Sequence, residues 1–497
     1  LSDKNRIKFI IINPRRGVIK DTNGKLLAHN KEIYKVYFYK QKGESYETIL
    51  EPVFDVLGCS PKNRLSLLKL VKKASYLQPI VIKDNVNWKT VVKIEAETYR
   101  LPGVSVEKSF VRYYPWKAKL AHVLGYTGLP NKKEIAAYKL QYARKAKIGK
   151  NGVERHLNHS LIGKFGAKKG EVNANRIIVR DLLVEPSCPG NDINLTINID
   201  LQNLLYNLLP KSNSAAAVIE VATGNILAIC SLPSFNPNLF STEFDEVEWN
   251  SVLQNKHSPF TNKVIGKAYP PGSTWKIITS LAILESGIDP RETVFCNGFI
   301  QVGNRKFKCW KRAGHGNVDF YNAMPFSCNC YFYKMGIKVG IERIYRVARA
   351  LGVGQKIGIE LSGEAQGINP NKLWKANYSH GSWTHGDTAN SSIGQGFVLT
   401  TPFQLMTMIS RVASGKIISP SLLKGHQKNF SAMDLPFKKE NLEIVRGSLV
   451  NAINSHRGTA FSARIREKQF LMAGKTGTAQ VVSRDTATEK GASRSHS

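Results

Sequence analysis

Ser273 and Lys276 lie three residues apart at the start of a predicted helix, where a serine could act as a nucleophile. Residues 271–276 read PGSTWK, and the apolar residues that follow recur at helical spacing as far as Gly287. A serine hydroxyl is a weak nucleophile at neutral pH, but a desolvated lysine on the same helical face can accept its proton. Ordinary helices also contain this pair, so it does not identify an active site by itself.

A second hydroxyl lies 54 residues downstream, in the motif Ser327-Cys328-Asn329. Acyl transfer needs a group that returns a proton to the leaving amine, and Ser327 can relay it. Asn329 can hold either the lysine or an amide of the substrate. This motif supplies two groups that a lone serine–lysine pair lacks.

The third motif, Lys475-Thr476-Gly477-Thr478, lies near the end of the chain on a predicted strand. Lys475 supplies a cation for a substrate carboxylate, and Gly477 leaves room for the substrate beside the strand. The backbone N–H groups of Ser273 and Thr478 could form an oxyanion hole. Three motifs in this order are typical of serine acyl-transfer enzymes that act on D-Ala-D-Ala or on β-lactams.

A second group of residues has the composition of a metal site. Cys296, Cys309, His315 and Cys328 fall within 33 residues and offer three thiols and one imidazole, a full tetrahedral set for Zn²⁺. Their spacing matches no zinc finger, so buried free cysteines or a disulfide are alternatives. Cys330 is an alternative ligand, which we rank second because a strand or helix would direct it elsewhere. Since all four positions come from protein, the metal would be structural, and Cys328 would fix its two catalytic neighbours.

The elements that must position these residues follow from the local pattern. Turn residues, apolar periodicity and cap residues predict the following elements: a hairpin turn at 22–24, a helix at 60–74 capped by Ser60, a strand and helix over 193–209, a hairpin over 214–235, helices from 273 to about 352, a loop at 380–396, a helix at 402–414 and a strand at 470–482.

The chain divides into two predicted domains. Residues 185–191 contain two prolines and one glycine and read as a linker. We therefore expect a β-rich, non-catalytic domain over 1–187 and a catalytic domain over 188–497. The first contains no catalytic constellation.

The composition indicates a globular and strongly basic protein. Lys and Arg number 71 against 37 Asp and Glu, which gives a formal net charge of +34. Nucleic acid is one partner that such a balance suggests, but the charge is scattered and no nucleic-acid-binding motif occurs. An exoplasmic protein near anionic lipid and wall polymer fits the charge equally well. The chain has no run of 18 apolar residues and begins without Met, so we interpret it as a fragment.

Over nearly its whole length the chain resembles the class B penicillin-binding proteins, in particular the elongation-type transpeptidases of the penicillin-binding protein 2 type. The segments that carry the resemblance are RRGVIKDTNGKLLA, KLAHVLGYTG (119–128), GKNGVERHLNHSLIGKFG (149–166), EVNANRIIVRDL (171–182), AYPPGSTWK (268–276) and GDTANSSIGQGFVLTTPFQL (386–405). Two departures stand out. Cys328 replaces the Asp of many β-lactamases, and only 15 residues follow Val482, where family members continue with further strands and a helix.

The resemblance implies an α/β (α+β) transpeptidase domain of the β-lactamase-like type, with a mixed, mainly antiparallel sheet, behind a pedestal domain of the dimerisation type. It implies a peptidoglycan D,D-transpeptidase that acylates Ser273 with the stem pentapeptide during cell-wall elongation and is acylated by β-lactams. The chemistry needs no cofactor, and proteins of this type have a zinc site in the segment that CNGFIQVGNRKFKCWKRAGHG resembles. The resemblance also implies a single inner-membrane anchor, absent here, and a catalytic domain in the periplasm. The partners that it implies are a membrane glycosyltransferase of the SEDS class and other elongation-complex proteins.

Three other functions fit parts of the sequence. A serine β-lactamase would turn over a chromogenic cephalosporin, but such enzymes are single domains of roughly half this length. A non-catalytic scaffold would keep the fold but would form no covalent adduct with a penicillin. A nucleic-acid binder would retain DNA in a salt-dependent way, and we rank it last.

Overall fold

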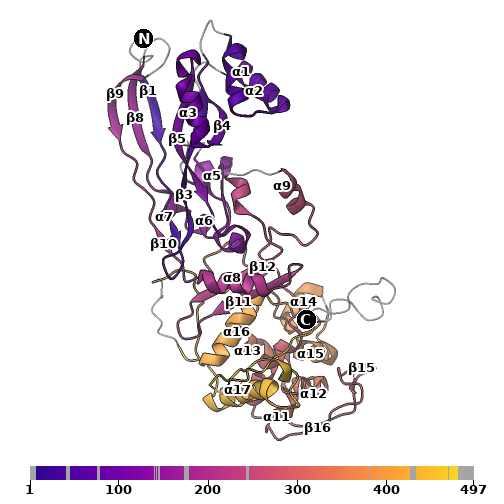
Figure 1. Cartoon of the computed structure of the whole chain (residues 1–497). Coiled ribbons are helices and arrows are strands. Elements are labelled where there is room, and N and C mark those ends of the chain that lie inside the picture. Colours follow the sequence, from indigo (N-terminus) through magenta and orange to yellow (C-terminus); the bar gives the residue numbers. More distant parts are fainter. Residues whose placement is uncertain are drawn as a thin grey trace. The chain divides into compact units, whose positions relative to one another are not determined.

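A computed structural model describes residues 7–479, except 41–44, 75–78, 139, 141–142, 144–145, 173–177, 242–245, 380, 426–432 and 468. The chain forms two units (Figure 1). Unit 1 contains residues 1–195 and 234–256, and unit 2 contains residues 196–233 and 257–497. No helix in the described ranges has the length and apolar character needed to cross a lipid bilayer.

The division falls after residue 195 rather than at the predicted boundary of 187, and residues 234–256 return to unit 1. Residues 188–194 are not a linker, because unit 1 pairs with them. Cys188 forms an antiparallel bridge with Lys164, and β10 (Ile193–Asn194) runs parallel to β2 (Ile19–Lys20). Proline and glycine break regular structure there, but the backbone groups between them still find partners in unit 1.

Unit 1 is built on a five-stranded sheet. Its central strand, β3 (Leu26–Phe38), pairs with β2, β4 (Ile80–Val86) and β5 (Val104–Tyr113), and β10 extends the sheet beyond β2. The predicted turn at 22–24 joins β2 to β3, with Gly24 at φ +84°. A second sheet has the order β1-β8-β9, and its strands are β1 (Ile7–Ile12), β8 (Gly166–Val172) and β9 (Ile178–Glu185).

The helices of unit 1 include the predicted helix at 60–74, which is α2 (Pro61–Lys73). Ser60 Oγ accepts a hydrogen bond from Asn63 N at 3.4 Å, as expected of its N-cap. The other elements are α1 (Tyr46–Val56), α3 (Trp88–Ala96), α4 (Ala121–Leu124), β6 (Thr127–Gly128), α5 (Lys132–Ala137), β7 (Ile148–Gly149), α6 (Gly152–His156), α7 (Asn158–Ile162) and α9 (Glu246–Leu253).

In unit 2, the predicted hairpin is β11 (Ser214–Ile219) paired antiparallel with β12 (Ile226–Leu232). Helix α8 (Ile199–Leu208) packs on β12, and α16 (Pro402–Ser414) packs on β11 (Figure 1). The predicted helix at 402–414 has these bounds because Thr401 and Gln404 form a capping box and Gly415 ends the helix in the left-handed conformation.

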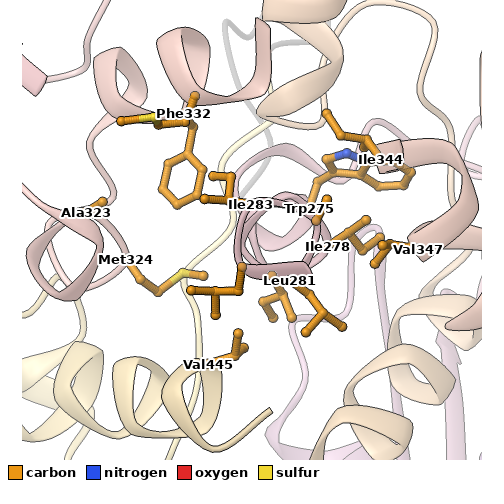
Figure 2. Close-up of a cluster of buried hydrophobic side chains, with 14 of the residues drawn as sticks. Trp275, Ile278, Leu281, Ile283, Ala323, Met324, Phe332, Ile344, Val347 and Val445 are labelled. Carbon is orange, nitrogen blue, oxygen red and sulfur yellow. The ribbon is translucent and has the colours of Figure 1, made fainter. Parts of the chain in front are cut away.

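The centre of unit 2 is α10 (Lys276–Glu285), in which every residue from 276 to 284 is buried. Figure 2 shows its side chains Ile278, Leu281 and Ile283 among those of neighbouring helices, with Phe332, Ile344 and Val445. These come from α12 (Asn329–Val339), α13 (Ile341–Ala350) and α17 (Lys439–Asn454). A helix that is buried on all sides belongs inside a core, and the predicted nucleophile lies in the turn directly before this one.

Small elements complete unit 2: β13 (Val294–Cys296), β14 (Phe299–Val302), β15 (Arg305–Lys308), β16 (Gly316–Val318), α11 (Phe320–Ala323), α14 (Lys372–Ser379) and α15 (His385–Ser392). Three predictions for this unit are wrong. The helices expected from 273 to about 352 are interrupted by the four short strands β13 to β16, because this segment folds into two hairpin-like antiparallel pairs. The 380–396 segment contains α15 rather than only loop, because Thr384 and Asp387 form a capping box that starts a helix. Residues 470–478 form no strand, since the described residues offer them no ladder of backbone hydrogen bonds.

Candidate active site and metal centre

A turn that only glycine can form presents Ser273. Gly272 has φ +56°, and a Cβ added there would lie 2.4 Å from the carbonyl oxygen of Thr478. Gly272 N donates to Gly394 O at 3.0 Å. A 3₁₀ turn (Gly272–Trp275) then leads directly into α10, with Trp275 fully buried in the core that Figure 2 shows. Ser273 therefore projects from an anchored turn.

The Ser327 turn, residues 324–329, brings the second motif to the same place. Ser327 adopts φ +52°, which is uncommon for a residue with a side chain, and is 5% exposed. Its N–H donates to Met324 O at 3.1 Å, and Cys328 N donates to Ala323 O at 3.0 Å. Asn329 is the first residue of α12. The turn fixes the two catalytic candidates on either side of Cys328.

Lys276 joins the first two motifs. Its side chain is completely buried, and Nζ donates to Ser327 O at 2.9 Å, to Ser327 Oγ at 3.1 Å and to Asn329 Oδ1 at 2.6 Å. Asn329 therefore holds the lysine, the first of the two roles that the sequence left open. The three donors of an ammonium group are all used.

The Ser327 hydroxyl forms hydrogen bonds with three other side chains of the site. Its oxygen accepts from Lys276 and, at 3.0 Å, from Lys475 Nζ, and its proton is donated to Ser273 Oγ at 3.2 Å. The two lone pairs of the oxygen are thus occupied. The hydrogen-bonded path from Ser273 to Lys276 runs through Ser327, whereas the sequence predicted direct proton transfer.

Burial weakens the basicity of both lysines, and the charge of Lys475 weakens that of Lys276 further. Burial, and then the charge of Lys475, lower the pKa of Lys276 to about 7. Burial lowers the pKa of Lys475 to about 8. A lysine with a pKa near neutrality is partly unprotonated at physiological pH and can act as a base.

The third motif lies against the first without pairing as a strand. Lys475 Nζ donates to Thr476 O at 3.1 Å and to Thr476 Oγ1 at 3.2 Å. A Cβ at Gly477 would lie 2.9 Å from the Thr274 side chain, so the missing side chain also permits packing within the site. Thr478 lies beside Gly272, close to the expected oxyanion hole.

Sequence reasoning missed Thr459, which connects two of the motifs. Its Oγ1 accepts from Thr476 Oγ1 at 3.2 Å, and its N–H donates to Pro325 O, at the start of the Ser327 turn, at 3.1 Å. Thr459 lies in the segment after α17, where the only sequence signal that could have identified it is a Gly-Thr pair in a turn. No periodicity predicts that this turn reaches the active site.

The four predicted metal ligands meet in one cluster. The ligand atoms of Cys296, Cys309, His315 and Cys328 all lie within 4.8 Å of one another. His315 Nδ1 lies 3.5 Å from Cys296 Sγ and 3.6 Å from Cys309 Sγ. For Zn–S near 2.3 Å and Zn–N near 2.0–2.1 Å, a tetrahedral ion separates N and S by about 3.6 Å. The donor set therefore has the composition of a zinc site, and His315 lies at the spacing from two of the thiols that Zn²⁺ requires.

Cys330 lies outside this set but beside it. Hydrogen bonds to the thiols of Cys309 and Cys328 raise its pKa, whereas hydrogen bonds from Cys328 and Cys330 lower the pKa of Cys309. Cys309, Cys328 and Cys330 thus share one buried environment. The group of ligand atoms within 4.8 Å of one another does not include Cys330, in line with its second rank.

Contacts around the metal cluster lead to the catalytic turn. Cys328 is the residue between Ser327 and Asn329 and the N-cap of α12. His315 stacks on Phe326 at 5.9 Å, and Trp310 Nε1 donates to Phe326 O at 3.0 Å. An ion held by the four ligands would therefore restrain the backbone that carries the catalytic hydroxyl.

Two known protein families match this chain, each mainly in one of its two units. Residues 214–496 match the family described as "Penicillin binding protein transpeptidase domain", and residues 11–195 match "Penicillin-binding Protein dimerisation domain". The match to the second family ends at 195, where the structural division lies.

Curated relatives align with almost the whole chain. A peptidoglycan D,D-transpeptidase MrdA of Acinetobacter baumannii is 34% identical over 97% of this chain and 73% of its own length. The protein of that name from Escherichia coli strain K12 is 30% identical over 97% of this chain and 78% of its own length.

Solved structures share the fold. A complex of penicillin-binding protein PBP2 with MreC from Helicobacter pylori matches with a TM-score of 0.85 and 30% identity, over 96% of this chain and 90% of the matched chain. PBP2 of Pseudomonas aeruginosa in complex with WCK 5153 matches with a TM-score of 0.71 and 29% identity, over 95% and 86%. A structure titled as a peptidoglycan synthase complex that coordinates polymerization and crosslinking matches with a TM-score of 0.76 and 28% identity, over 96% and 82%.

Proposed function

Because the chain belongs to the penicillin-binding protein transpeptidases, we propose that it cross-links peptidoglycan stem peptides through an acyl-enzyme on Ser273. The two-domain fold and the class of enzyme are those expected from the sequence. The observation that carries the proposal is the hydrogen-bonded path from Ser273 through Ser327 to Lys276, a lysine that burial makes a base.

The reaction begins with proton movement along this path. When Lys276 is neutral, Ser327 passes its proton to Nζ and takes the proton of Ser273, which becomes the nucleophile. Ser273 Oγ attacks the carbonyl carbon of the D-Ala-D-Ala bond, and the backbone N–H groups of Ser273 and Thr478 stabilise the oxyanion. The C–N bond breaks, and the leaving D-alanine takes the proton back through Ser327.

The second half transfers the acyl group. An amine of a neighbouring stem attacks the ester on Ser273, its proton passes to the Ser327–Lys276 path, and the Ser273 hydroxyl is restored as the new amide forms. Lys475 and Thr476 hold the terminal carboxylate of the donor peptide, and Asn329 keeps Lys276 aimed at Ser327. A β-lactam presents its ring amide in place of the peptide bond and leaves a stable ester on the same serine.

The experiment that tests this function is intact-mass measurement after incubation with a penicillin. Wild type is expected to gain one penicillin mass, Ser273→Ala none, and Ser286→Ala, at the other end of α10, the same mass as wild type. An adduct that persists on Ser273→Ala would exclude Ser273 as the nucleophile. Rapid turnover of a chromogenic cephalosporin would identify a β-lactamase, and the absence of any adduct on folded wild type would identify a scaffold.

Zn²⁺ is the metal that we propose for Cys296, Cys309, His315 and Cys328, and its role is structural because protein fills all four positions. Support comes from the sulfur–nitrogen distances and from three thiols beside one imidazole. Elemental analysis of purified protein is expected to give one zinc per chain in wild type and in Cys59→Ser, and much less in Cys309→Ser. Equal zinc in the two variants would contradict the assignment.

The finer biological setting is also a proposal. We place the catalytic unit in the periplasm, anchored to the inner membrane, in the machinery of cell elongation, with a membrane glycosyltransferase and other elongation proteins as partners. The support is the likeness to structures titled as complexes with MreC and with a peptidoglycan synthase. Fractionation of cells that express the natural protein, followed by co-purification, tests this setting. Recovery in the soluble cytosolic fraction would contradict it.

A further inference from the structure

Unit 1 contains a partly open cavity of about 220 Å³ that the catalytic reaction does not use. Its wall comes from the segment before β2, from the middle of β3, from β5 and from the segment before β7. Five cationic side chains line it, and the only carboxylate among the lining residues is Asp84. The cationic residues are Arg15, Arg16, Lys35, Arg112 and Lys147.

Two of the cations are already paired with Glu154, which is fully buried behind them. Its carboxylate accepts from Arg16 Nε at 2.5 Å and from Arg112 Nε at 2.6 Å. The two arginines outweigh the penalty of burial and lower the pKa of Glu154, so the trio keeps one net positive charge. Arg112 Nη2 is buried and has no hydrogen-bond partner among the described residues.

Two of the other three cations, Lys147 and Arg15, contact neutral groups. Lys147 Nζ donates to the carbonyls of Phe240 at 3.3 Å and Ser241 at 3.5 Å. The guanidinium of Arg15 lies 4.4 Å from the ring centre of Phe110. Carbonyls and an aromatic ring orient a cation without neutralising it, so the positive charge of the cavity persists.

Lys35 and Lys147 repel each other across this space. Partial desolvation, and then the charge of Lys35, lower the pKa of Lys147, while Asp84 opposes the shift. Like charges that share a cavity cost free energy unless an anion lies between them. Their placement is the arrangement that a bound anion would favour.

We propose that this cavity binds a small, multiply charged phosphate, of the size of inorganic phosphate or diphosphate. At about 30 Å³ per water molecule, the volume holds about seven waters, which suits a phosphate or diphosphate group. A phosphate offers several acceptor oxygens to converging ammonium and guanidinium donors. The same chemistry arises in a free phosphate compound and in a lipid headgroup.

Isothermal titration with sodium pyrophosphate at low salt tests the proposal on the whole chain. Saturable binding is expected for wild type, with affinity at least about tenfold weaker in the double variant Lys35→Gln/Lys147→Gln. The matched control Lys62→Gln/Lys69→Gln removes the same charge from the surface of α2 and is expected to bind like wild type. Absence of binding by folded wild type, or equal weakening in both double variants, would overturn the proposal.

A second variant covers the case in which the double variant does not fold. Asp84→Asn removes the opposing charge from the exposed rim, so pyrophosphate is expected to bind a few-fold more tightly. Unchanged or weaker binding to folded Asp84→Asn would contradict the proposed site.

Vesicles distinguish the two sources of phosphate. If the ligand is a headgroup, vesicles of phosphatidylglycerol and phosphatidylcholine are expected to retain wild type and the control but not Lys35→Gln/Lys147→Gln. If the ligand is a free phosphate compound, the lysine variant loses pyrophosphate binding while vesicle retention stays equal to that of the control. All of these readouts are independent of penicillin acylation.

Discussion

Replacing Lys475 by glutamine should shift the pH at which the enzyme becomes reactive. Lys276 Nζ and Lys475 Nζ lie 3.1 and 3.0 Å from Ser327 Oγ, so the two ammonium groups are separated by at most about 6 Å. With an effective dielectric constant of about 20, two unit charges at about 6 Å repel by about 2.8 kcal/mol, or about two pKa units. At this dielectric constant a shorter separation would give a larger repulsion, so the figure sets the scale of the Lys475 contribution, while burial remains the larger cause of the depressed pKa of Lys276.

The sign follows from the role of Lys276 as a base. Removing the charge at 475 raises the pKa of Lys276 from about 7, and the neutral fraction at a given pH falls. For the full shift, the fraction that is neutral at pH 7 drops from about half to about one in a hundred. The midpoint of the acylation rate against pH should therefore move upward by one to about two units.

The assay is the second-order rate of acylation by a penicillin between pH 5.5 and 10. Loss of the carboxylate contact lowers the plateau at every pH, whereas the change in pKa moves the midpoint, so the midpoint is the informative quantity. Lys475→Arg keeps the charge and is expected to keep the midpoint of wild type. A midpoint in Lys475→Gln that coincides with wild type would refute the electrostatic coupling of the two lysines.

Three further predictions concern other parts of the molecule. Thr459→Val removes the acceptor of the Thr476 hydroxyl and should slow acylation about tenfold, because an unpaired polar group costs about 1–3 kcal/mol. Thr459→Ser keeps the acceptor and should acylate at a rate close to that of wild type. Equal acylation rates in the two variants would contradict a role for the Thr459 hydroxyl. Glu154→Gln should lower the free energy of unfolding by about 3–5 kcal/mol in denaturant titration, since it leaves two buried arginines uncompensated. The pKa of Glu154 is depressed in the folded state, so ionised Glu154 stabilises the fold above its unfolded pKa of about 4.3, and this stabilisation is lost as the pH falls through the folded pKa. The difference in the free energy of unfolding between Glu154→Gln and wild type should therefore shrink in acid. Removal of bound metal by a strong chelator should slow acylation and expose thiols to a thiol reagent, with activity restored by Zn²⁺; unchanged acylation of metal-free protein would separate the metal from the Ser327 turn.

The sequence was most informative where chemistry depends on residue type. Ser273, Lys276, Ser327 and Lys475 could be singled out because acyl transfer needs a nucleophile, a base, a relay and a cation, and the structure brings them together. That Cys296, Cys309, His315 and Cys328 come together could be predicted for the same reason, since few residue types bind zinc, and zinc itself stays a proposal. Helix caps such as Ser60 also depend on local composition, and they were found where expected.

Pairings between distant segments could not be predicted in this way. Thr459 reaches the site because the segment after α17 returns to the Ser327 turn, a tertiary contact with no local pattern. The segment at 470–478 begins with an apolar run that suggested a strand, but a strand exists only where a partner supplies hydrogen bonds, and residues 480–482 of that prediction lie outside the described residues. The capping box of Thr384 and Asp387 overrode the loop composition of its surroundings, and β10 paired with unit 1 despite the prolines before it.

The burial of α10 on every side has a consequence for how the site accommodates bulky molecules. A helix packed in this way exchanges its amide hydrogens only when the surrounding core opens, so we expect the turn before it, which presents Ser273, to move little during the catalytic cycle. The room needed by acyl groups of different shapes must then come from the facing wall, the segments around Thr459 and Lys475, which no sheet of the described residues restrains. Substitutions that discriminate between a drug and the natural peptide are therefore expected to accumulate in that wall, while the nucleophile's own helix stays constant.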